Sequence, residues 1–563
     1  MTHKIKNLED LISLASLHRV PWVKDPEVHH IALGYLMDFA EDIIKLLQKD
    51  LNEIHKIDMP LRYWRIILSP WLMQFLAMTY DRYSLVDGVI NDICSAELGV
   101  SKNLFITPRN TYEALKLSET EHFNNQILTD IFSLMKASDK IKVRSQTPLI
   151  FETIPKFRNE NNYKKNILNK ISRLLTSKKS IVASYSSIPY QLQLSLIPKV
   201  KNLRPIFPYI DGVENYKYPV NINIRRRILE KQKTKIIFKK IVFSILPKYL
   251  PICFVEGYTK LKYLSKRYGK APKVIITGTE MYSRYESYMH WVGESAIKGT
   301  KLISMQHGGN YGMELRSEKT IVEINPYDIF YSWGWVWDQY KRTSSSKIKP
   351  MPATFLTSIK QPERNKVEKK EILLTVTSIR KTIRRLDCSL MNPYNNQTYF
   401  SAQLEFYESL NSQNREQLKV RLYKDDLGNC YKERWLQKFP NISFDKNSSF
   451  NQSLRNSKLY VSDHLSTTWL EAITINKPTI LFISGRLYDY TYEFKELMNE
   501  LKEVSVFHES AHSAATFINQ NYSNINNWWS SENVQSAISN LQNTLAYTPD
   551  NWLEKWANEL KTL

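Results

Sequence analysis

The chain is poor in cysteine and has no long apolar run. Its 563 residues include four cysteines without paired spacing, which argues against a disulfide framework and against a thiolate metal site. A reducing cytoplasm is therefore the expected compartment. No run of 18 apolar residues occurs, so no segment is expected to span a membrane. The first 20 residues carry acidic side chains within their apolar pattern, which is not typical of a signal peptide.

Several motifs that define enzyme classes are also missing. The sequence contains no GxxxxGK[ST], GxGxxG, GxSxG or HExxH motif. Their absence weakens assignment as an NTPase, a dehydrogenase, an α/β-hydrolase or a zinc protease. No two aspartates are separated by a single residue, so the Asp-x-Asp metal motif is absent as well.

Positive charge is in excess, with 78 Lys and Arg against 56 Asp and Glu and a net charge of +22. Such a surface attracts nucleic acid, anionic lipid or phosphorylated small molecules. Nucleic acid is not the expected partner, because the excess is spread along the chain without a compact basic patch of stacking aromatics. A hydrophobic content of 42% supports large cores and a globular protein.

Hydrophobic periodicity divides the chain into five parts. Apolar residues at helical spacing predict a helical region first, and strands alternating with helices later predict parallel sheets with crossover helices. The expected strands are residues 274–277, 302–305, 329–332, 372–377, 420–423, 458–462, 479–483 and 503–507. The expected parts are a helical region at 1–135, a Rossmann-like domain at 136–345, a linker at 346–370, a nucleotide-binding Rossmann-like domain at 371–545 and a C-terminal helix at 546–563.

Two segments of the first half have unusual composition. Residues 63–83 are aromatic and helical, and Pro70 is expected to kink or start a helix there. Asp81 and Arg82 would be neighbours on its last turn, as an ion pair or as part of a pocket. Residues 223–247 mix cations with apolar side chains, which fits two interpretations: contact with an anionic membrane surface, or a helix on the core with solvated lysines.

The first candidate site follows the expected strand at 302–305. This strand ends at Gln306-His307-Gly308-Gly309, so the polar pair would lie at a carboxyl end, where open α/β sheets bind ligands. The two glycines would allow positive φ and a close approach of the backbone to a ligand. A tight turn with a hydrogen-bonded histidine is the alternative for His307.

The second candidate site follows the expected strand at 458–462. It consists of Asp463 and His464, of Ser466, Thr467 and Thr468 at a helix start, and of Glu471 within that helix. Hydroxyls, free backbone N–H groups and the positive end of the helix dipole together form an anion site. Helix capping alone is the alternative, although one geometry can serve both roles.

Further charged residues follow other expected strands. Glu280 comes after the strand at 274–277, where a carboxylate could act as general base or nucleophile. Arg380 and Lys424 follow two strands of the second domain and would neutralise phosphate in the same cleft. Arg384 and Arg385 fit this cleft and a solvated surface equally well.

Three blocks resemble a family of bacterial surface-polysaccharide transferases. They are residues 306–312 (QHGGNYG) with 331–335 (YSWGW), residues 462–471 (SDHLSTTWLE), and the aromatic block at 63–82. More distantly, the pattern is similar to capsule and lipopolysaccharide transferases that use CMP-Kdo and to two-domain bacterial sialyltransferases. The resemblance implies an α/β, GT-B-like fold, in which two Rossmann-like domains face a cleft and the second domain holds the nucleotide without a metal or other cofactor.

The resemblance also implies roles for individual residues. Ser466 and Thr467 would bind the donor phosphate, Glu471 the ribose or base, and His307 would lie near the reacting centre or the phosphate. The His-Pro dipeptide of the sialyltransferases is missing, because Gly308 follows His307. No carboxylate matches the catalytic one, so Glu280 is chosen by its position.

The sequence therefore predicts a metal-independent glycosyltransferase that moves a sugar, such as Kdo or another nonulosonic acid, from a CMP-linked donor to O-antigen, capsule or lipopolysaccharide. Its predicted catalytic residues are His307, Glu280 and Gln306. Its predicted donor-binding residues are Gly308, Gly309, Arg380, Lys424, Asp463, His464, Ser466, Thr467, Thr468 and Glu471. Its expected partners are the nucleotide sugar, the glycan acceptor and the inner face of the cytoplasmic membrane. The alternatives are a CDP-polyol phosphotransferase of cell-wall polymer synthesis and a non-catalytic protein that binds nucleic acid or glycan.

Overall fold

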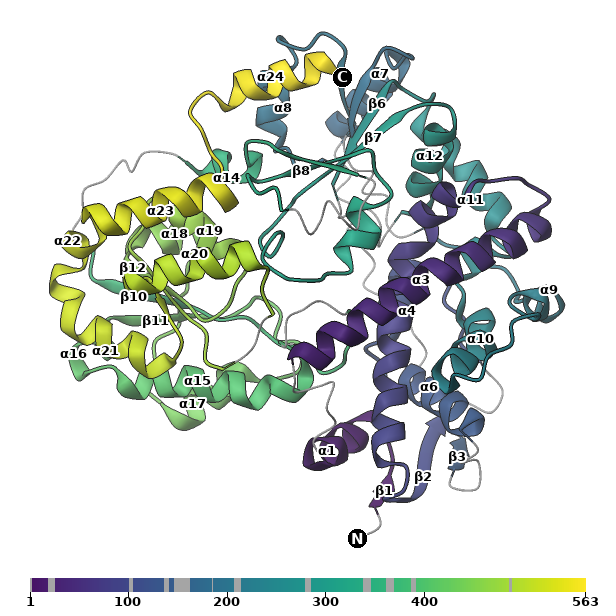
Figure 1. Ribbon diagram of the computed structural model, residues 1–563, viewed down its shortest axis with the longest axis horizontal. Coiled ribbons are helices and arrows are strands. Elements are labelled where there is room, and N and C mark those ends of the chain that lie inside the picture. Colours follow the sequence, from purple (N-terminus) through teal and green to yellow (C-terminus); the bar gives the residue numbers. More distant parts are fainter. Residues whose placement is uncertain are drawn as a thin grey trace.

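The computed structural model describes residues 3–18, 26–100, 105–135, 141–145, 163–184, 186–206, 214–278, 285–337, 346–360, 369–385, 391–485 and 489–563. These residues form two parallel α/β sheets and a mainly helical N-terminal region (Figure 1). Within each large sheet every pairing is parallel. The prediction of an α/β fold with two Rossmann-like domains is therefore confirmed.

The N-terminal region is built around the long helices α3 (Pro26–His55) and α4 (Leu61–Val89), which pack on each other. Helix α4 buries most of its side chains and runs through Pro70, so the expected helix start at this proline is wrong. It also packs against α12 (Glu286–Ile297) and thereby joins the region to the first large sheet. The remaining helices are α1 (Leu8–His18), α5 (Thr111–Leu117) and α6 (Glu121–Leu134).

The N-terminal region also contains a small parallel sheet that the helical pattern did not predict. Its strands are β1 (His3–Ile5), β2 (Ile93–Val100) and β3 (Ile141–Ser145), in that order. Strand β2 buries Ile93, Ala96 and Leu98 in the core that it shares with α4 and α6. These strands lie far apart in sequence, so local periodicity carries little information about their pairing.

The first large sheet has six strands in the order β5-β4-β6-β7-β8-β9. They are β4 (Ile181–Ser184), β5 (Leu203–Ile206), β6 (Val274–Thr277), β7 (Lys301–Met305), β8 (Ile329–Ser332) and β9 (Lys347–Pro350). Strand β9 and helix α14 (Thr354–Ile359) occupy part of the range expected to be a linker. The last helix, α24 (Trp552–Thr562), returns to this sheet and lies beside α8 (Tyr190–Leu196) (Figure 1).

The second large sheet has five strands in the order β11-β10-β12-β13-β14. They are β10 (Glu371–Thr375), β11 (Leu418–Arg421), β12 (Ser457–Ser462), β13 (Thr479–Phe482) and β14 (Phe507–His508). The chain order reverses between β10 and β12, and open α/β sheets bind ligands beyond the carboxyl ends of the strands at such a switch point.

Helices cover the second sheet on both faces (Figure 1). They are α15 (Asn396–Ser409), α17 (Tyr431–Lys438), α18 (Phe450–Asn456), α19 (Thr467–Thr474), α20 (Tyr492–Glu503), α21 (Ala511–Asn521) and α23 (Glu532–Leu545). None of the helices in the described ranges combines the length and the hydrophobicity that crossing a bilayer requires.

Candidate functional site

The loop after β7 touches the start of α19, so the two candidate sites meet between the two large domains. The backbone N–H of Gly309 donates to Oγ1 of Thr467 over 2.9 Å. A Cβ atom on Gly309 would lie 2.5 Å from the carbonyl oxygen of Ser466, and one on Gly308 would lie 3.0 Å from Oγ1 of Thr467. The close approach of the two backbones therefore requires glycine at position 309.

The expected positive φ at these two glycines is wrong. Positive φ occurs instead at Asn310, with 69°, and at Gly312, with 74°. The backbone does approach another group closely, as expected, but that group is the start of α19 in the second domain and not a ligand.

Gln306 anchors this loop. Its side chain is fully buried, and its Oε1 accepts hydrogen bonds from Trp333 N over 2.9 Å and from Trp335 Nε1 over 2.8 Å. Its Nε2 donates to the carbonyl oxygen of Gly308 over 2.9 Å. With both ends of the amide engaged inside the loop, Gln306 holds the loop in shape instead of facing a ligand.

His307 lies at the first-domain side of the contact. Its side chain is 34% exposed, and its Nε2 lies 3.8 Å from Oε2 of the buried Glu323. Tyr311 packs edge-on against the ring at 5.4 Å between centroids and donates its hydroxyl proton to the same carboxylate. Glu323 was not among the predicted site residues, and its carboxylate is close enough to the ring to stabilise His307 if that side chain is protonated.

Asp463 and His464 form a second acid–histidine pair. Oδ1 of Asp463 lies 2.7 Å from Nδ1 of His464, and the same oxygen accepts from the hydroxyl of Tyr399 over 2.7 Å. Gln403 donates to the other carboxylate oxygen over 2.8 Å. The buried aspartate is thus fully engaged, and it fixes the ring so that Nε2 is left for a ligand.

The start of α19 carries three hydroxyl side chains, which are hydrogen-bonded to one another or to the loop after β7. Ser466 is its N-cap, and its Oγ lies 2.8 Å from the hydroxyl of Thr468. Along the same helix, burial raises the pKa of Glu471 to about 7. This carboxylate makes no side-chain hydrogen bond with the residues that the structure describes. A capping serine and the positive end of the helix dipole favour an anion, and a buried carboxylate without a hydrogen-bond partner favours hydroxyl donors.

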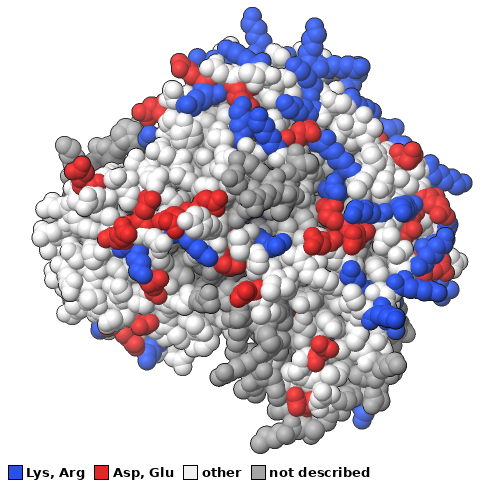
Figure 2. Space-filling model, viewed as in Figure 1, with Lys and Arg blue, Asp and Glu red and all other residues white. Residues whose placement is uncertain are grey.

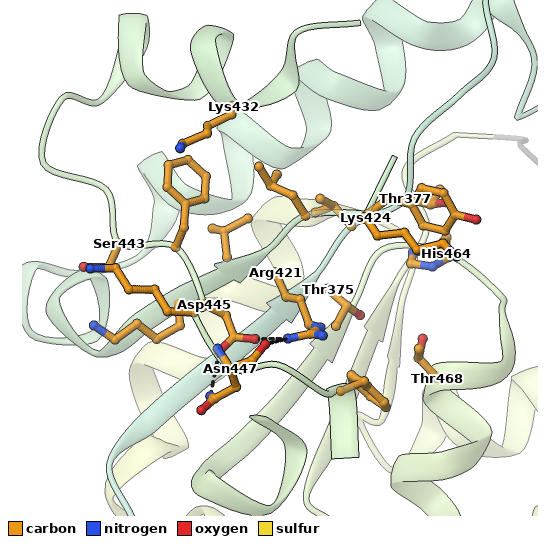
Figure 3. A pocket seen from close by; sticks show the side chains of 18 of the residues that line it. Thr375, Thr377, Arg421, Lys424, Lys432, Ser443, Asp445, Asn447, His464 and Thr468 are labelled. Atoms are coloured by element: carbon orange, nitrogen blue, oxygen red, sulfur yellow. Dashed lines mark hydrogen bonds and ion pairs between the residues drawn. The ribbon is translucent and has the colours of Figure 1, made fainter. Parts of the chain in front are cut away.

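A large cavity of about 1030 Å³ opens at the carboxyl ends of β10 and β11 and reaches α19 (Figure 3). We call it the large cavity. Lys424, which is exposed, and Lys432 line it, and Arg421 is held within it by an ion pair with Asp445. The polar residues that line it are Glu371, Thr375, Thr377, Lys419, Arg421, Tyr423, Lys424, Lys432, Ser443, Asp445, Lys446, Asn447, His464, Ser466, Thr467 and Thr468.

A small cavity of about 230 Å³ shares Thr377, His464 and Ser466 with the large one. Arg380, Arg384 and Arg385 line it, together with Asn310, Asn392 and His29 of α3. We call it the small cavity. Arg380 and Arg384 both pair with Glu119 of the N-terminal region, the latter over 3.1 Å.

The small cavity concentrates buried positive charge. Burial and the neighbouring Arg380 lower the pKa of Arg384 to about 9. Nδ2 of Asn392 and Oδ1 of Asn310 are buried without a hydrogen-bond partner among the described residues. The arginines and the Asn392 amide donor favour an anionic group as the ligand of this cavity, and the Asn310 oxygen favours a hydroxyl donor on the same ligand.

Among the predicted site residues, Gly308 and Gly309 meet Thr467 at the contact, and Arg380, Lys424, His464, Ser466, Thr467 and Thr468 line the two cavities. Gln306, His307, Asp463 and Glu471 line neither cavity. Glu280 lies outside the described residues, so its position stays a prediction. Within the described ranges, no group of three or more His, Cys, Asp or Glu side chains could hold a metal ion. The expectation of a reaction without a metal therefore also stays a prediction.

Comparison with solved structures finds distant likenesses. They include S. aureus MnaA in complex with UDP, at 11% identity and a TM-score of 0.37, covering 68% of this chain and 96% of that one. The α,α-trehalose 6-phosphate synthase of Burkholderia multivorans has 10% identity and a TM-score of 0.37, covering 69% of this chain and 99% of that one. The wall teichoic acid polymerase TagF has 10% identity and a TM-score of 0.34, covering 71% of this chain and 93% of that one.

These TM-scores are low, so the fold assignment rests on the sheet topology itself. No curated protein matches the chain. The family described as LIC12162 family transferase matches residues 12–560, which is nearly the whole chain. The chain therefore belongs to the LIC12162 family of transferases.

Proposed function

We propose that this transferase is a glycosyltransferase that moves an acidic sugar, of the Kdo or nonulosonic type, from a CMP-linked donor to a bacterial surface glycan. The observation that carries the proposal is the contact of Gly309 with Thr467, which joins the two candidate sites at the meeting point of two cavities. The nucleotide would occupy the large cavity, and the sugar would occupy the small one.

The large cavity suits a nucleotide by place and by charge. It lies at the switch point of the second sheet, where α/β proteins bind nucleotides. The start of α19 would hold the phosphate, and Lys424 and Lys432 would add charge to stabilise it as it leaves. Glu471, whose pKa is raised to about 7 by burial, would accept hydrogen bonds from ribose hydroxyls.

The small cavity suits an acidic sugar. A volume of about 230 Å³ is of the size of one sugar ring, and its arginines and Asn392 would bind the carboxylate. Because Arg384 is already crowded by a like charge, binding an anion there would relieve repulsion as well as form hydrogen bonds.

The reaction would take place where the two cavities join. The bond between the anomeric carbon and the phosphate oxygen breaks, and the nucleotide leaves with the electron pair. An acceptor hydroxyl oxygen forms the new bond to that carbon. His307, whose ring lies beside Glu323, would take the hydroxyl proton.

Nucleotide-induced stabilisation tests the proposal. CMP in large excess should raise the melting temperature of the wild type, because a ligand at about 100 times its Kd adds roughly 2.7 kcal/mol of stability. Ser466→Ala should fold and lose most of this shift. Ser510→Ala is the matched control, because Ser510 caps α21 in the same way, accepting from Ser513 N over 3.1 Å, away from both cavities.

The outcome separates the proposal from its rivals. Equal CMP shifts in the two serine variants would contradict the placement of the phosphate, and the absence of any shift with CMP or CDP would refute the nucleotide site. His307→Ala should bind CMP but lose turnover of CMP-Kdo. The mass of the product separates sugar transfer from polyol-phosphate transfer, because the latter product retains phosphate.

A further inference from the structure

A groove of about 860 Å³ lies beside α9 (Ile222–Arg227) and α10 (Ile237–Tyr249) and shares no lining residue with the two cavities of the site. We call it the basic groove. Its apolar lining includes Val220, Ile222, Leu229 and Phe243. Its cationic lining includes Arg226, Lys233 and Lys240, all of them exposed. The proposed reaction gives this groove no role.

The segment that forms the basic groove has a strong excess of positive charge. Residues 222–248 contain nine Lys and Arg and one Glu. Arg225, Arg227 and Lys248 form ion pairs with acidic residues of the protein, and the amine of Lys239 lies 4.7 Å from the centre of the Phe39 ring. These four cations are therefore accounted for by the fold.

The other five cations are Arg226, Lys231, Lys233, Lys235 and Lys240. All are exposed, and none forms a hydrogen bond or an ion pair within the described part of the chain. Figure 2 shows Lys and Arg side chains gathered over the part of the surface where α9 and α10 lie. An anionic partner is the chemistry that this arrangement fits.

Large apolar side chains are exposed among these cations. Ile222 is 61% exposed, Ile236 is 51%, Ile237 is 50% and Val220 is 39%. Solvent penalises such a cluster, whereas the boundary between lipid head groups and acyl chains accepts both the isoleucines and the surrounding lysines. A free phosphate or a soluble nucleotide would leave the isoleucines exposed to water.

We propose that the basic groove docks on a bilayer surface rich in anionic phospholipids, with Ile222, Ile236 and Ile237 entering the interface. Docking is peripheral, which agrees with the lack of a membrane-crossing helix in the described ranges. Nucleic acid is disfavoured, because the groove offers Phe105 and Phe243 but no row of exposed rings on which bases could stack. The inference is independent of the nucleotide site, since no residue is shared.

Co-sedimentation with lipid vesicles tests this surface. The wild type should pellet with vesicles that contain phosphatidylglycerol and stay in solution with phosphatidylcholine alone. Each cation near an anionic surface contributes roughly fivefold to the affinity. Lys233→Glu with Lys240→Glu should therefore weaken binding by at least about 25-fold, because each change removes an attraction and adds a repulsion.

Two further variants make the result specific. Lys495→Glu with Lys561→Glu has the same net charge as the groove variant, but its changes lie at exposed positions on α20 and α24. It should bind almost as the wild type does. Ile222→Ser with Ile237→Ser keeps every charge and should also weaken binding. Melting temperatures confirm that all variants fold.

Several results would overturn the inference. They are equal loss of binding in the two charge variants, unchanged binding of the isoleucine variant, and no binding to phosphatidylglycerol vesicles at low salt. Tighter binding to single-stranded DNA than to vesicles, lost in the groove variant, would assign the surface to nucleic acid. The CMP shift is measured in the same proteins, so failure of the nucleotide site and failure of the membrane surface are separate outcomes.

Discussion

Gly309→Ala is the most direct test of the contact between the two domains. The added Cβ would lie 2.5 Å from the carbonyl oxygen and 2.6 Å from the carbonyl carbon of Ser466. Non-bonded heavy atoms prefer a separation of about 3.5 Å, so the loop and the start of α19 must move apart by about 1 Å. The hydrogen bond from Gly309 N to Thr467 Oγ1, now 2.9 Å, would then break.

The expected effect divides between stability and turnover. A lost neutral hydrogen bond costs about 1 kcal/mol, and overpacking costs roughly 1–3 kcal/mol, so the variant should fold with a lower melting temperature. A displacement of about 1 Å between reacting groups can lower turnover by roughly 100-fold. The affinity for CMP should change little if the loop yields and should fall if the start of α19 moves, because Ser466, Thr467 and Thr468 line the large cavity.

The assay compares release of CMP from CMP-Kdo with the Kd of CMP measured by calorimetry. Gly308→Ala is the matched control, because its Cβ would meet only the Thr467 hydroxyl, at 3.0 Å, and a hydroxyl rotates more easily than a backbone moves. A Gly309→Ala protein that turns over within threefold of the wild type, with the hydrogen bond intact in its crystal structure, would refute this reasoning.

Three further changes test buried charge. Burial and the charge of Glu214 raise the pKa of Glu286 from 4.5 to about 7. The folded protein should therefore lose about 3 kcal/mol of stability as the pH rises from 4.5 to 7, because over this range the carboxyl ionises in the unfolded chain but stays largely protonated in the folded one. Glu286→Gln should remove the corresponding decline in melting temperature. If ionised Glu471 binds ribose, the affinity for CMP should rise as pH passes through about 7, and Glu471→Gln should bind weakly at every pH by calorimetry. Arg82→Met leaves Asp81 buried without its ion pair, so the free energy of unfolding should fall by about 3–5 kcal/mol, measured by thermal unfolding. The double variant with Asp81→Asn should recover part of this loss.

Five strands of the two large sheets were predicted well, because buried parallel strands are short apolar runs with clear ends. Strand β6 has the predicted limits, and β7, β8, β12 and β13 differ by at most one residue at either end. Strands β10 and β11 end two residues earlier than predicted, and β4 and β5 were not predicted. The edge strand β14 was misplaced, because α20 continues through Glu503 and leaves only Phe507–His508 to pair. Local propensity cannot show where a helix ends and a strand begins when that strand forms only by pairing with a neighbouring strand.

The partners of the site residues were harder to predict than the residues themselves. The loop after β7 contains two adjacent glycines and the start of α19 contains three adjacent hydroxyl side chains, so both could be predicted as candidate sites from the sequence. Tyr399 and Glu119 act through contacts made by folding, and nothing in their local sequence marks them. Glu323 follows His307 closely in the sequence, but only the fold shows that its carboxylate lies beside that ring. The same holds for Asp81 and Arg82, which form a buried pair that reaches Tyr394 and the backbone of Ile383.

These long-range contacts show that the N-terminal region is part of the site. Arg82 donates to the carbonyl oxygen of Ile383 over 2.7 Å, and Glu119 pairs with Arg380 and Arg384. Ile383 and both arginines line the small cavity, as does His29 of α3. The two Rossmann-like domains alone would therefore leave that cavity open on one side and two of its arginines without their carboxylate. If the proposed function holds, the N-terminal region would therefore help to decide which sugar is transferred, whereas the residues that line the large cavity all belong to the second domain.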